Sequence, residues 1–511
     1  MEPFQWWNDS QKKLAQDAAK LTDEKLIPYG EKCAWQKKYP REAVKWMAEQ
    51  GWFGVQIPSR YGGRAEEWGV TGACILLEET FRAGNLAVPL NTSMIGGIHQ
   101  ILHDGTEEQK RKWLPKIARG ELLGAIVMTE PHAGSDIANM ETSAFRDGDF
   151  YIINGKKRFQ MLAGAADLYM TYVRTSEKPE DVAKYRHLTA FIIEKGMPGF
   201  SVEKINDFTG LDGMYNGNLN FRNVKVPMAN RIGEEGAGWT VMMSGLNVER
   251  IVNSAGPLGQ MRECIRYTVQ HLQRRVQFGR LTGDLATNQF KVADMLGKLQ
   301  TGRLLTYYAA YCADLGKETA LEAAIAKKFN TDSCLSVAID AIQCMGGNGV
   351  SKYYPVERIM RDAKLQQIAG GSNEVLSLLM YRQGLKNIMD DLKVPPRVMD
   401  KEIGVPMPLG KIEKQGSVSK DRDILNLLAE NYRVNPGLHM SMADIKTYLN
   451  VNDQNLIDYL VNLEKAGFAN LYRDNRGKVQ LARATYKGLE AANPIDYYKY
   501  IPPWVDKVDM F

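Results

Sequence analysis

The sequence predicts a multidomain α+β protein with an N-terminal helical domain, a middle β-barrel domain, a C-terminal helical bundle and a smaller fourth domain. Three observations support this prediction. The chain has 511 residues, which is more than one hydrophobic core usually holds. The spacing of apolar residues is helical up to about residue 120, then typical of short β-strands, and helical again from Gly238 to about residue 390. A segment rich in Pro and Gly then separates the last part of the chain.

The N-terminal domain and the bundle are predicted from apolar residues that recur three and four positions apart, as one face of a helix requires. In the N-terminal domain this spacing is seen in Leu76–Phe81, Met94–His103 and Glu107–Ile117. In the bundle it extends over three long segments, Trp239–Val276, Thr287–Leu315 and Lys317–Met345. Gly346 and Gly347 follow the last segment and are predicted to end that helix.

The middle domain is predicted from short β-strand patterns. Phe150–Ile153 is followed by Asn154-Gly155, a dipeptide typical of the type I′ turn of a β-hairpin. Leu188–Glu194 and Leu219–Val226 have further strand patterns, and Pro227 ends the second of them. We therefore expect the chain to turn back on itself at Asn154-Gly155.

The last part of the chain is predicted to contain an exposed linker, a small module and a terminal arm. Helical patterns precede a hairpin pattern centred on Asn475-Arg476-Gly477, in the order Asp423–Tyr432, Ser441–Leu449, Asn455–Ala466 and Leu471–Leu481. Three helices followed by a hairpin resemble a winged-helix module. The predicted boundaries are 1–122 for the N-terminal domain, 123–232 for the β-barrel, 233–390 for the bundle, 391–419 for the linker, 420–493 for the winged-helix-like module and 494–511 for the arm.

The composition argues against several classes of protein. The formal net charge is only +5, and the third helix of the module, Asp453–Lys465, carries three acids and one base, so nucleic-acid binding is not expected. No apolar stretch approaches the length of a membrane span, and the N-terminus lacks the pattern of a secretory signal. The six cysteines and six histidines are not grouped at metal-binding spacing. We expect reduced cysteines, no metal and a cytoplasmic location.

A loop at the start of the middle domain has the residue types of a phosphate-binding site. Its sequence is Met128-Thr129-Glu130-Pro131-His132-Ala133-Gly134-Ser135-Asp136. The small Ala-Gly pair lets backbone amides approach an anion, and the Ser135 hydroxyl can donate to a phosphate. The string resembles the flavin signature of the acyl-CoA dehydrogenases, which implies FAD as cofactor. The resemblance places Thr129 at the pyrimidine edge of the flavin and Met128 in the same cofactor-binding set.

Two further segments resemble the second half of that flavin site, which in this family comes from the neighbouring subunit. Arg275-Val276-Gln277-Phe278-Gly279 resembles the family's Arg-x-x-Phe-Gly, in which the arginine pairs with the pyrophosphate and the phenylalanine meets the adenine. Gln343, Gly346 and Gly347 resemble the complementary loop, whose glycines permit close backbone approach. Arg275 taken alone could equally be a solvated charge. The resemblance implies a homo-oligomer, either a tetramer or a dimer.

One segment of the flavin site departs from the family's pattern. Where the family has Asn-Gly-x-Lys-x-Trp-Ile-Thr-Asn, Phe159 replaces the tryptophan and Met161 replaces the threonine. Phe159 still supplies an aromatic wall, but the Met161 thioether cannot donate the hydrogen bond that the threonine gives to the flavin's reactive nitrogen. We expect a shifted redox potential or an altered reactivity with oxygen. Ser372, in the C-terminal signature, is also assigned to the cofactor.

The same resemblance shows a gap where the family's commonest catalytic glutamate belongs. The string Ala369-Gly370-Gly371-Ser372-Asn373-Glu374-Val375 resembles the family's C-terminal signature, with Gly370 at that position. Glu374 is expected to be a solvated or salt-bridged charge. Glu249 lies in a run that resembles the isovaleryl-CoA dehydrogenase branch, and there and in long-chain members the base lies on this earlier helix. We therefore expect Glu249 to be the base; the alternative is a surface pair with Arg250.

The substrate expectation follows from small residues in the acyl pocket. Most straight-chain members carry Tyr-Glu where this chain has Ala369-Gly370, so the resemblance implies room beside the α and β carbons, with Arg250 and Gly371 as further substrate-binding residues. The expected function is oxidation of a branched, alicyclic or otherwise bulky acyl-CoA, with an electron-transfer flavoprotein as acceptor. A same-fold oxidase, an enoyl-CoA reductase and an inactive acyl-CoA-sensing scaffold are the alternatives. The resemblance covers residues 20 to 390.

Overall fold

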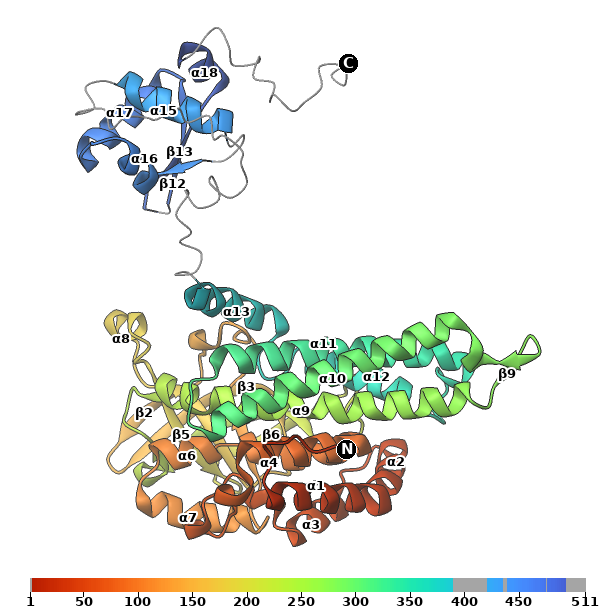
Figure 1. Cartoon of the computed structure of the whole chain (residues 1–511). Helices are drawn as coiled ribbons and strands as arrows, with labels where there is room; N and C mark the ends of the chain where they lie inside the picture. Colours follow the sequence, from red (N-terminus) through yellow and green to blue (C-terminus); the bar gives the residue numbers. More distant parts are fainter. Residues whose placement is uncertain (1, 389–420, 435–438, 475, 493–511) are drawn as a thin grey trace. The chain divides into compact units, whose positions relative to one another are not determined.

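The computed structural model describes residues 2–388, 421–434, 439–474 and 476–492, and it divides into two compact units, Met1–Met389 and Asp390–Phe511 (Figure 1). The predicted linker at 391–419 and the predicted arm at 494–511 lie outside the described residues, as does Asn475 of the predicted hairpin turn. Among the described helices, none combines the length and the apolar content that crossing a membrane requires.

The N-terminal domain is helical, as the sequence predicts. Its central helix α4 (Ala65–Thr80) is buried over most of its length and packs against α1 and against α9 of the bundle. Capping boxes start α1 and α7, where Asn8 and Thr106 accept hydrogen bonds from backbone amides three residues on. The other helical elements are α1 (Asp9–Leu21), η1 (Thr22–Leu26), α2 (Ile27–Gln36), α3 (Arg41–Glu49), η2 (Trp52–Gly54), η3 (Ser59–Tyr61), η4 (Phe81–Ala87), α5 (Val88–Ile95), α6 (Ile98–Asp104) and α7 (Glu107–Ala118).

The middle domain is an open sheet, so the predicted closed barrel is wrong. The strands follow the order β6-β7-β3-β2-β4-β5-β8, and β1 pairs in parallel with β4. The end strands β6 and β8 do not pair with each other in the described part of the chain, and β8 has only two residues with which to form a ladder. The strands are β1 (Gly124–Val127), β2 (Ser143–Asp147), β3 (Phe150–Met161), β4 (Leu168–Arg174), β5 (Leu188–Glu194), β6 (Phe200–Ile205), β7 (Asn216–Pro227) and β8 (Arg231–Ile232), with α8 (Pro179–Ala183) between β4 and β5.

The predicted turn at Asn154-Gly155 is also wrong, because β3 runs through both residues. The chain turns earlier, at Gly148, whose φ is +59°. Gly155 has a φ of +146° and lies where the register of β3 on β7 shifts, which is a β-bulge. A Cβ at Gly155 would lie 2.6 Å from the Thr142 Cα, and the Asn154 side chain accepts a hydrogen bond of 2.8 Å from the Asn223 amide. The dipeptide therefore forms a bulge in β3, at which the backbone passes close to Thr142 and pairs with Asn223 of β7.

The C-terminal bundle contains the three long helices that the sequence predicts, α9 (Gly238–Leu272), α10 (Ala286–Asp314) and α11 (Ala320–Met345). Gly346 follows α11 with a φ of +58°, which confirms the predicted glycine stop. Between α9 and α10 the chain forms a small hairpin of β9 (Val276–Gln277) and β10 (Arg280–Leu281), which extends from one end of the bundle (Figure 1). The helices α12 (Val356–Gln366) and α13 (Asn373–Ile388) complete the first unit.

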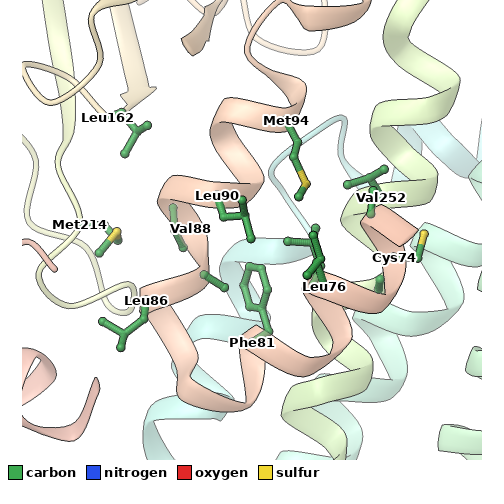
Figure 2. Packing of buried hydrophobic residues seen from close by; sticks show 14 of the residues in the cluster. Cys74, Leu76, Phe81, Leu86, Val88, Leu90, Met94, Leu162, Met214 and Val252 are labelled. Carbon is green, nitrogen blue, oxygen red and sulfur yellow. The ribbon is translucent and has the colours of Figure 1, made fainter. Parts of the chain in front are cut away.

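One hydrophobic core joins the N-terminal helices, the sheet and the bundle. Figure 2 shows Phe81, Leu90 and Met94 of the N-terminal domain in the same cluster as Leu162, which follows β3, and Val252 of α9. The packing is close, because a Cβ at position 256 of α9 would lie 3.0 Å from the Phe81 ring. Helix α9 is therefore held on several sides, and side chains that it directs inward are fixed.

The second unit has the elements that the sequence predicts, in the predicted order. Its helices and hairpin are α15 (Asp421–Val434), α16 (Met442–Tyr448), α17 (Asp453–Lys465), β12 (Ala469–Arg473) and β13 (Val479–Ala484), with the additional β11 (Met440–Ser441) and α18 (Tyr486–Ala492). The sheet order is β11-β13-β12. Leu456, Leu460 and Leu463 of α17 are buried in a core that belongs to this unit alone. The winged-helix assignment stays a prediction.

Candidate active site

Glu249 is a buried carboxylate on α9. Its exposed fraction is 5%, and Gln100 of α6 donates from Nε2 to its Oε1 at 2.9 Å. Burial raises the pKa of Glu249 to about 7, although the Gln100 hydrogen bond and the charge of Arg250 act in the opposite direction. A carboxyl group with this pKa can both accept and release a proton near neutral pH. The alternative of a surface pair with Arg250 is wrong, because Glu249 is not at the surface.

Several polar atoms close to Glu249 are buried without a hydrogen-bond partner among the described residues. They are Oε1 of Gln100, Nε2 of His99, the Tyr172 hydroxyl and Nε of Arg250. Burial lowers the pKa of His99 to about 4, so this imidazole is neutral. Burial and the charge of Glu249 raise the pKa of Tyr172. Unpaired buried polar atoms are costly and are usually satisfied by a ligand or by water, so this region has the polar groups that a bound substrate would use.

The glycine loop of the C-terminal signature lies beside the same helix. A Cβ at Gly370 would lie 3.6 Å from Nδ2 of Asn253, and one at Gly371 would lie 3.9 Å from a guanidinium nitrogen of Arg250. The φ angles of Gly370 and Gly371 are +68° and +92°, a region that L side chains rarely adopt. The structure therefore brings the loop of Gly370 and Gly371 close to Arg250, on the helix that carries Glu249.

Lys327 of α11 holds this loop, and the sequence analysis did not identify it. Its Nζ donates to the Gly371 carbonyl and to Oδ1 of Asn373, both at 3.0 Å. Burial lowers the pKa of Lys327 to about 8. Asn253 was also missed, and its Oδ1 accepts a hydrogen bond of 2.8 Å from Asn91 of α5. Lysine and asparagine in the middle of long helices give no local signal, since their partners are far away in the sequence.

Glu374 is exposed and lies at the start of α13. A hydrogen bond with its own backbone amide and another with Ser372 lower its pKa. A solvated carboxylate with a lowered pKa is a weak base, so Glu374 has the environment that the sequence analysis expects of it. Ser372 lies in the loop just before α13 and contacts the Val375 amide through its hydroxyl at 3.4 Å.

The first half of the predicted flavin site is assembled by β3 and the loop after β1. The Met128 carbonyl accepts from Nζ of Lys157 at 3.0 Å, and the Thr129 carbonyl accepts from the Arg158 amide at 2.8 Å. Lys157 also forms a buried ion pair of 2.8 Å with Glu130. These contacts place the loop beside Phe159, whose ring is 44% exposed. Thr129 and Phe159 are therefore neighbours.

Met161 is partly buried, and its environment includes an asparagine that the sequence analysis missed. Nδ2 of Asn216, on β7, lies 3.2 Å from the Met161 sulfur and donates to the Phe159 carbonyl at 2.9 Å. A thioether sulfur is a weak acceptor, so the Asn216 amide fixes both the side chain of Met161 and the backbone of Phe159. Asn216 pairs with Met161 across the two strands.

The second half of the predicted flavin site lies elsewhere on the same chain. Arg275 and Phe278 belong to the β9–β10 hairpin, and the Phe278 ring is 93% exposed. Gln343 and Gly346 are exposed at the end of α11. Figure 1 shows the hairpin projecting from the end of the bundle, away from β3, which carries Phe159 and Met161, so one chain does not bring the two halves together.

The residues at both places fit a dinucleotide. A Cβ at Gly134, Gly346 or Gly347 would meet nothing within 4 Å, so the backbone there is open to a ligand. The Ser135 hydroxyl is exposed and has no partner among the described residues. Open backbone amides, a free hydroxyl and the Arg275 guanidinium are groups that bind phosphates. Together with the buried carboxylate, they are the groups that a flavin-dependent oxidoreductase requires.

Comparison with known families agrees with this class. Models of the N-terminal, middle and C-terminal domains of acyl-CoA dehydrogenase match residues 8–121, 125–224 and 236–385. The chain therefore belongs to the acyl-CoA dehydrogenase family, whose members are FAD-dependent oxidoreductases of acyl-CoA metabolism. The second unit lies outside these matches.

Similar curated proteins act on several acyl groups. The chain is 37% identical over 383 residues to the mitochondrial 2-methylacyl-CoA dehydrogenase of Solanum tuberosum, covering 74% of this chain and 92% of that protein. It is 38% identical over 379 residues to the mitochondrial isovaleryl-CoA dehydrogenase of Pongo abelii, covering 73% and 88%. It is also 38% identical over 346 residues to the cyclohex-1-ene-1-carbonyl-CoA dehydrogenase of Geobacter metallireducens, covering 67% and 90%. Among solved structures, butyryl-CoA dehydrogenase from Megasphaera elsdenii is similar with a TM-score of 0.72 and 34% identity, covering 75% and 100%.

Proposed function

We propose that this acyl-CoA dehydrogenase uses Glu249 to remove the α-proton of a bulky acyl-CoA and forms an α,β-enoyl-CoA. The observation that carries the proposal is the environment of Glu249, a buried carboxyl group whose pKa is raised to about 7, on the helix that also contacts the Gly370-Gly371 loop. A base must be ionised when substrate arrives and must hold the proton after the transfer, and a pKa near the working pH allows both.

The residues of the chain would divide the work as follows. Glu249 accepts the α-proton, and the unpaired buried atoms of Arg250 and Tyr172 are available to a polar group of the substrate or to a water that it displaces. Thr129, Ser135 and Phe159 would hold FAD, with Met128, Met161 and Ser372 next to them. Bound there, FAD would supply the acceptor for the hydride that leaves the β carbon. Burial of Glu249 keeps water from the base and so keeps its pKa near 7.

The size of the substrate follows from the space at the glycine loop. The Cβ position at Gly370 has only Nδ2 of Asn253 within 4 Å, so this position is open where the usual family glutamate would stand. The similar proteins named for 2-methylacyl, isovaleryl and cyclohexene-carbonyl groups all take chains that are branched or ringed near the thioester. We therefore infer a branched or alicyclic acyl group.

The test is anaerobic reduction of the bound flavin by straight, branched and alicyclic acyl-CoA esters. The wild-type protein should lose its yellow colour fastest with branched or alicyclic esters. Glu249→Gln should retain FAD but lose reduction by at least about 1,000-fold, because an amide cannot accept the proton. Glu374→Gln, a change of the same kind at an exposed position, should remain active.

Other outcomes separate the alternative functions. Full activity of Glu249→Gln would refute the assignment of the base. Retained flavin without bleaching by any ester would support the inactive sensing scaffold instead. Rapid reoxidation by oxygen would support an oxidase, whereas reduction only of enoyl-CoA by a reduced flavin would support a reductase.

We also infer that the active protein is a homo-oligomer that delivers electrons to an electron-transfer flavoprotein. The separation of the two halves of the flavin site on one chain supports the oligomer, because Arg275 and Phe278 then meet the loop of a second copy.

The second unit is proposed to be a winged-helix-like docking module. Arg473 of its β-hairpin pairs with Glu464 of α17, so this basic group is already neutralised, and a nucleic-acid partner is not favoured.

A further inference from the structure

Gln100 is the one side chain among the described residues that donates a hydrogen bond to Glu249. Its Nε2 donates to Oε1, and no hydrogen bond from the described residues reaches Oε2. Gln100 therefore holds Oε1 in place, and Oε2 is available to accept a proton. A hydrogen bond to a buried carboxylate fixes its orientation and favours its ionised form.

The main chain of α9 is shaped for this pair. Gly245 lies one helical turn before Glu249, on the same face. A Cβ at Gly245 would lie 2.8 Å from Nε2 of Gln100 and 3.0 Å from Oε1 of Glu249. Any side chain at this position would therefore push the amide away from the carboxylate. The absence of a Cβ leaves the room in which the hydrogen bond forms.

The remaining charged and titratable groups around Glu249 do not replace this interaction. Arg250, next in the chain, acts on Glu249 through its charge and forms no ion pair with it among the described residues. His99 of α6 is neutral above about pH 4. Burial, together with the charges of Glu249 and Asp104, raises the pKa of Tyr172 of β4, and its contact with Gln100 opposes this shift only in part. Tyr172 is therefore a neutral phenol at the pH of the reaction. Gln100 is thus the uncharged donor that stabilises the carboxylate.

We propose that Gln100 is the positioning residue of the base: it directs the free oxygen of Glu249 toward the substrate and favours the ionised form of Glu249. This inference rests on the proposed role of Glu249. In the reaction the α C–H bond breaks and its proton forms an O–H bond at Oε2, while the hydrogen bond from Gln100 to Oε1 is kept. The electron pair left on the α carbon forms the α,β double bond, and the hydride that leaves the β carbon would pass to the flavin. The Gln100 amide takes up no proton, so its loss should shift the pH dependence of the reaction while Glu249 remains the base.

The direct test is Gln100→Met, which keeps the length of the side chain and removes the donor. We expect the midpoint of the pH profile for anaerobic flavin reduction by an active acyl-CoA to rise by about one pH unit, because the carboxylate loses a charge-assisted hydrogen bond. The rate below the midpoint should fall about tenfold and should recover at higher pH, while the FAD content and KM change little.

Gly245→Ala is a second variant that reaches the same pair from α9. It should move the midpoint in the same direction, since the new methyl group occupies the space between Gln100 and Glu249. If Gln100→Met does not yield folded flavoprotein, this variant provides the test.

Gln109→Met is the matched control. Gln109 is another buried glutamine, and its amide donates to the carbonyls of Ala229 and Arg231, away from Glu249. This variant should lose stability but keep the wild-type midpoint. An unchanged midpoint in flavin-loaded Gln100→Met or Gly245→Ala would overturn the proposal for Gln100. Activity of Glu249→Gln, in contrast, would refute the assignment of Glu249 as the base, so the failure of the proposed function and the failure of the Gln100 proposal are distinguishable.

Discussion

The burial of Glu249 raises its pKa, and the same burial makes the stability of the protein depend on pH. Its folded-state pKa of about 7 lies above the ordinary value of 4.5 because burial disfavours the charge. The folded protein therefore binds a proton more tightly than the unfolded chain. The contribution of Glu249 to the free energy of unfolding is therefore most favourable below pH 4.5 and decreases as the pH rises from 4.5 to about 7, because the folded protein then has to hold a buried charge.

Glu249→Gln should consequently stabilise the apoprotein at pH 8 by about 1 to 3 kcal/mol, since the amide has no charge to desolvate. The difference should nearly vanish at pH 4.5, where the wild-type carboxyl is largely protonated. Thermal or denaturant unfolding of both proteins at the two pH values measures it. A difference in stability between the wild type and the variant that is the same at both pH values would contradict the raised pKa of Glu249.

At the residue scale, the sequence identifies the candidates that belong to motifs and misses those that do not. Gly370 in place of the family's glutamate directs attention to Glu249, and the structure places Glu249 in a buried polar site. Gln100 is 149 residues away from its partner, and Lys327 contacts a loop more than 40 residues further on. Such contacts arise only when helices pack, so no local pattern could have indicated them.

At the scale of single elements, β3 and the loop after β1 depend on one buried ion pair. Lys157 and Glu130 are almost completely buried, and Lys157 also donates to the carbonyls of Met128 and Tyr172, at 3.0 and 2.7 Å. Burial lowers the pKa of Lys157 to about 8, while Glu130 opposes this shift. The pair thus joins β3, β4 and the loop after β1.

Lys157→Met should destabilise the protein by about 3 to 5 kcal/mol and lower its FAD content, because it leaves the Glu130 charge buried without a partner. The double variant with Glu130→Gln should recover part of the loss. The readouts are the FAD-to-protein ratio and the thermal midpoint. Lys156→Met is the control, since Lys156 pairs with Glu203 at the exposed surface and should change either readout little. Equal effects of the two lysine variants would show that the buried pair has no special role.

The errors at this scale have a common cause. Asn154-Gly155 is a strong local signal for a turn, but the same freedom of φ also suits a bulge, and only the neighbouring strand decides between them. Barrel closure likewise depends on whether two end strands meet, which their own sequences do not state. The long helices of the bundle were predictable because their apolar spacing repeats over many turns.

At the scale of the whole molecule, the main question is whether the flavin site is shared between copies of the chain. The loop with Ser135 and the hairpin with Arg275 lie apart on one chain, and both are exposed. Exposed apolar residues on α10, including Leu304 and Tyr308, offer a surface that a second copy could cover. A shared site makes a prediction that a site within one chain does not.

Ser135→Asp and Arg275→Glu should each abolish FAD binding when expressed alone, because each places a carboxylate against the cofactor phosphates. When the two variants are co-expressed, a mixed oligomer contains sites formed by the intact loop of one copy and the intact hairpin of the other. Those sites should bind FAD and be reduced by substrate, whereas mixing the two proteins as separately folded oligomers should restore flavin only as fast as subunits exchange. If each chain completed its own site, co-expression would restore nothing, because every chain would still carry one of the two defects.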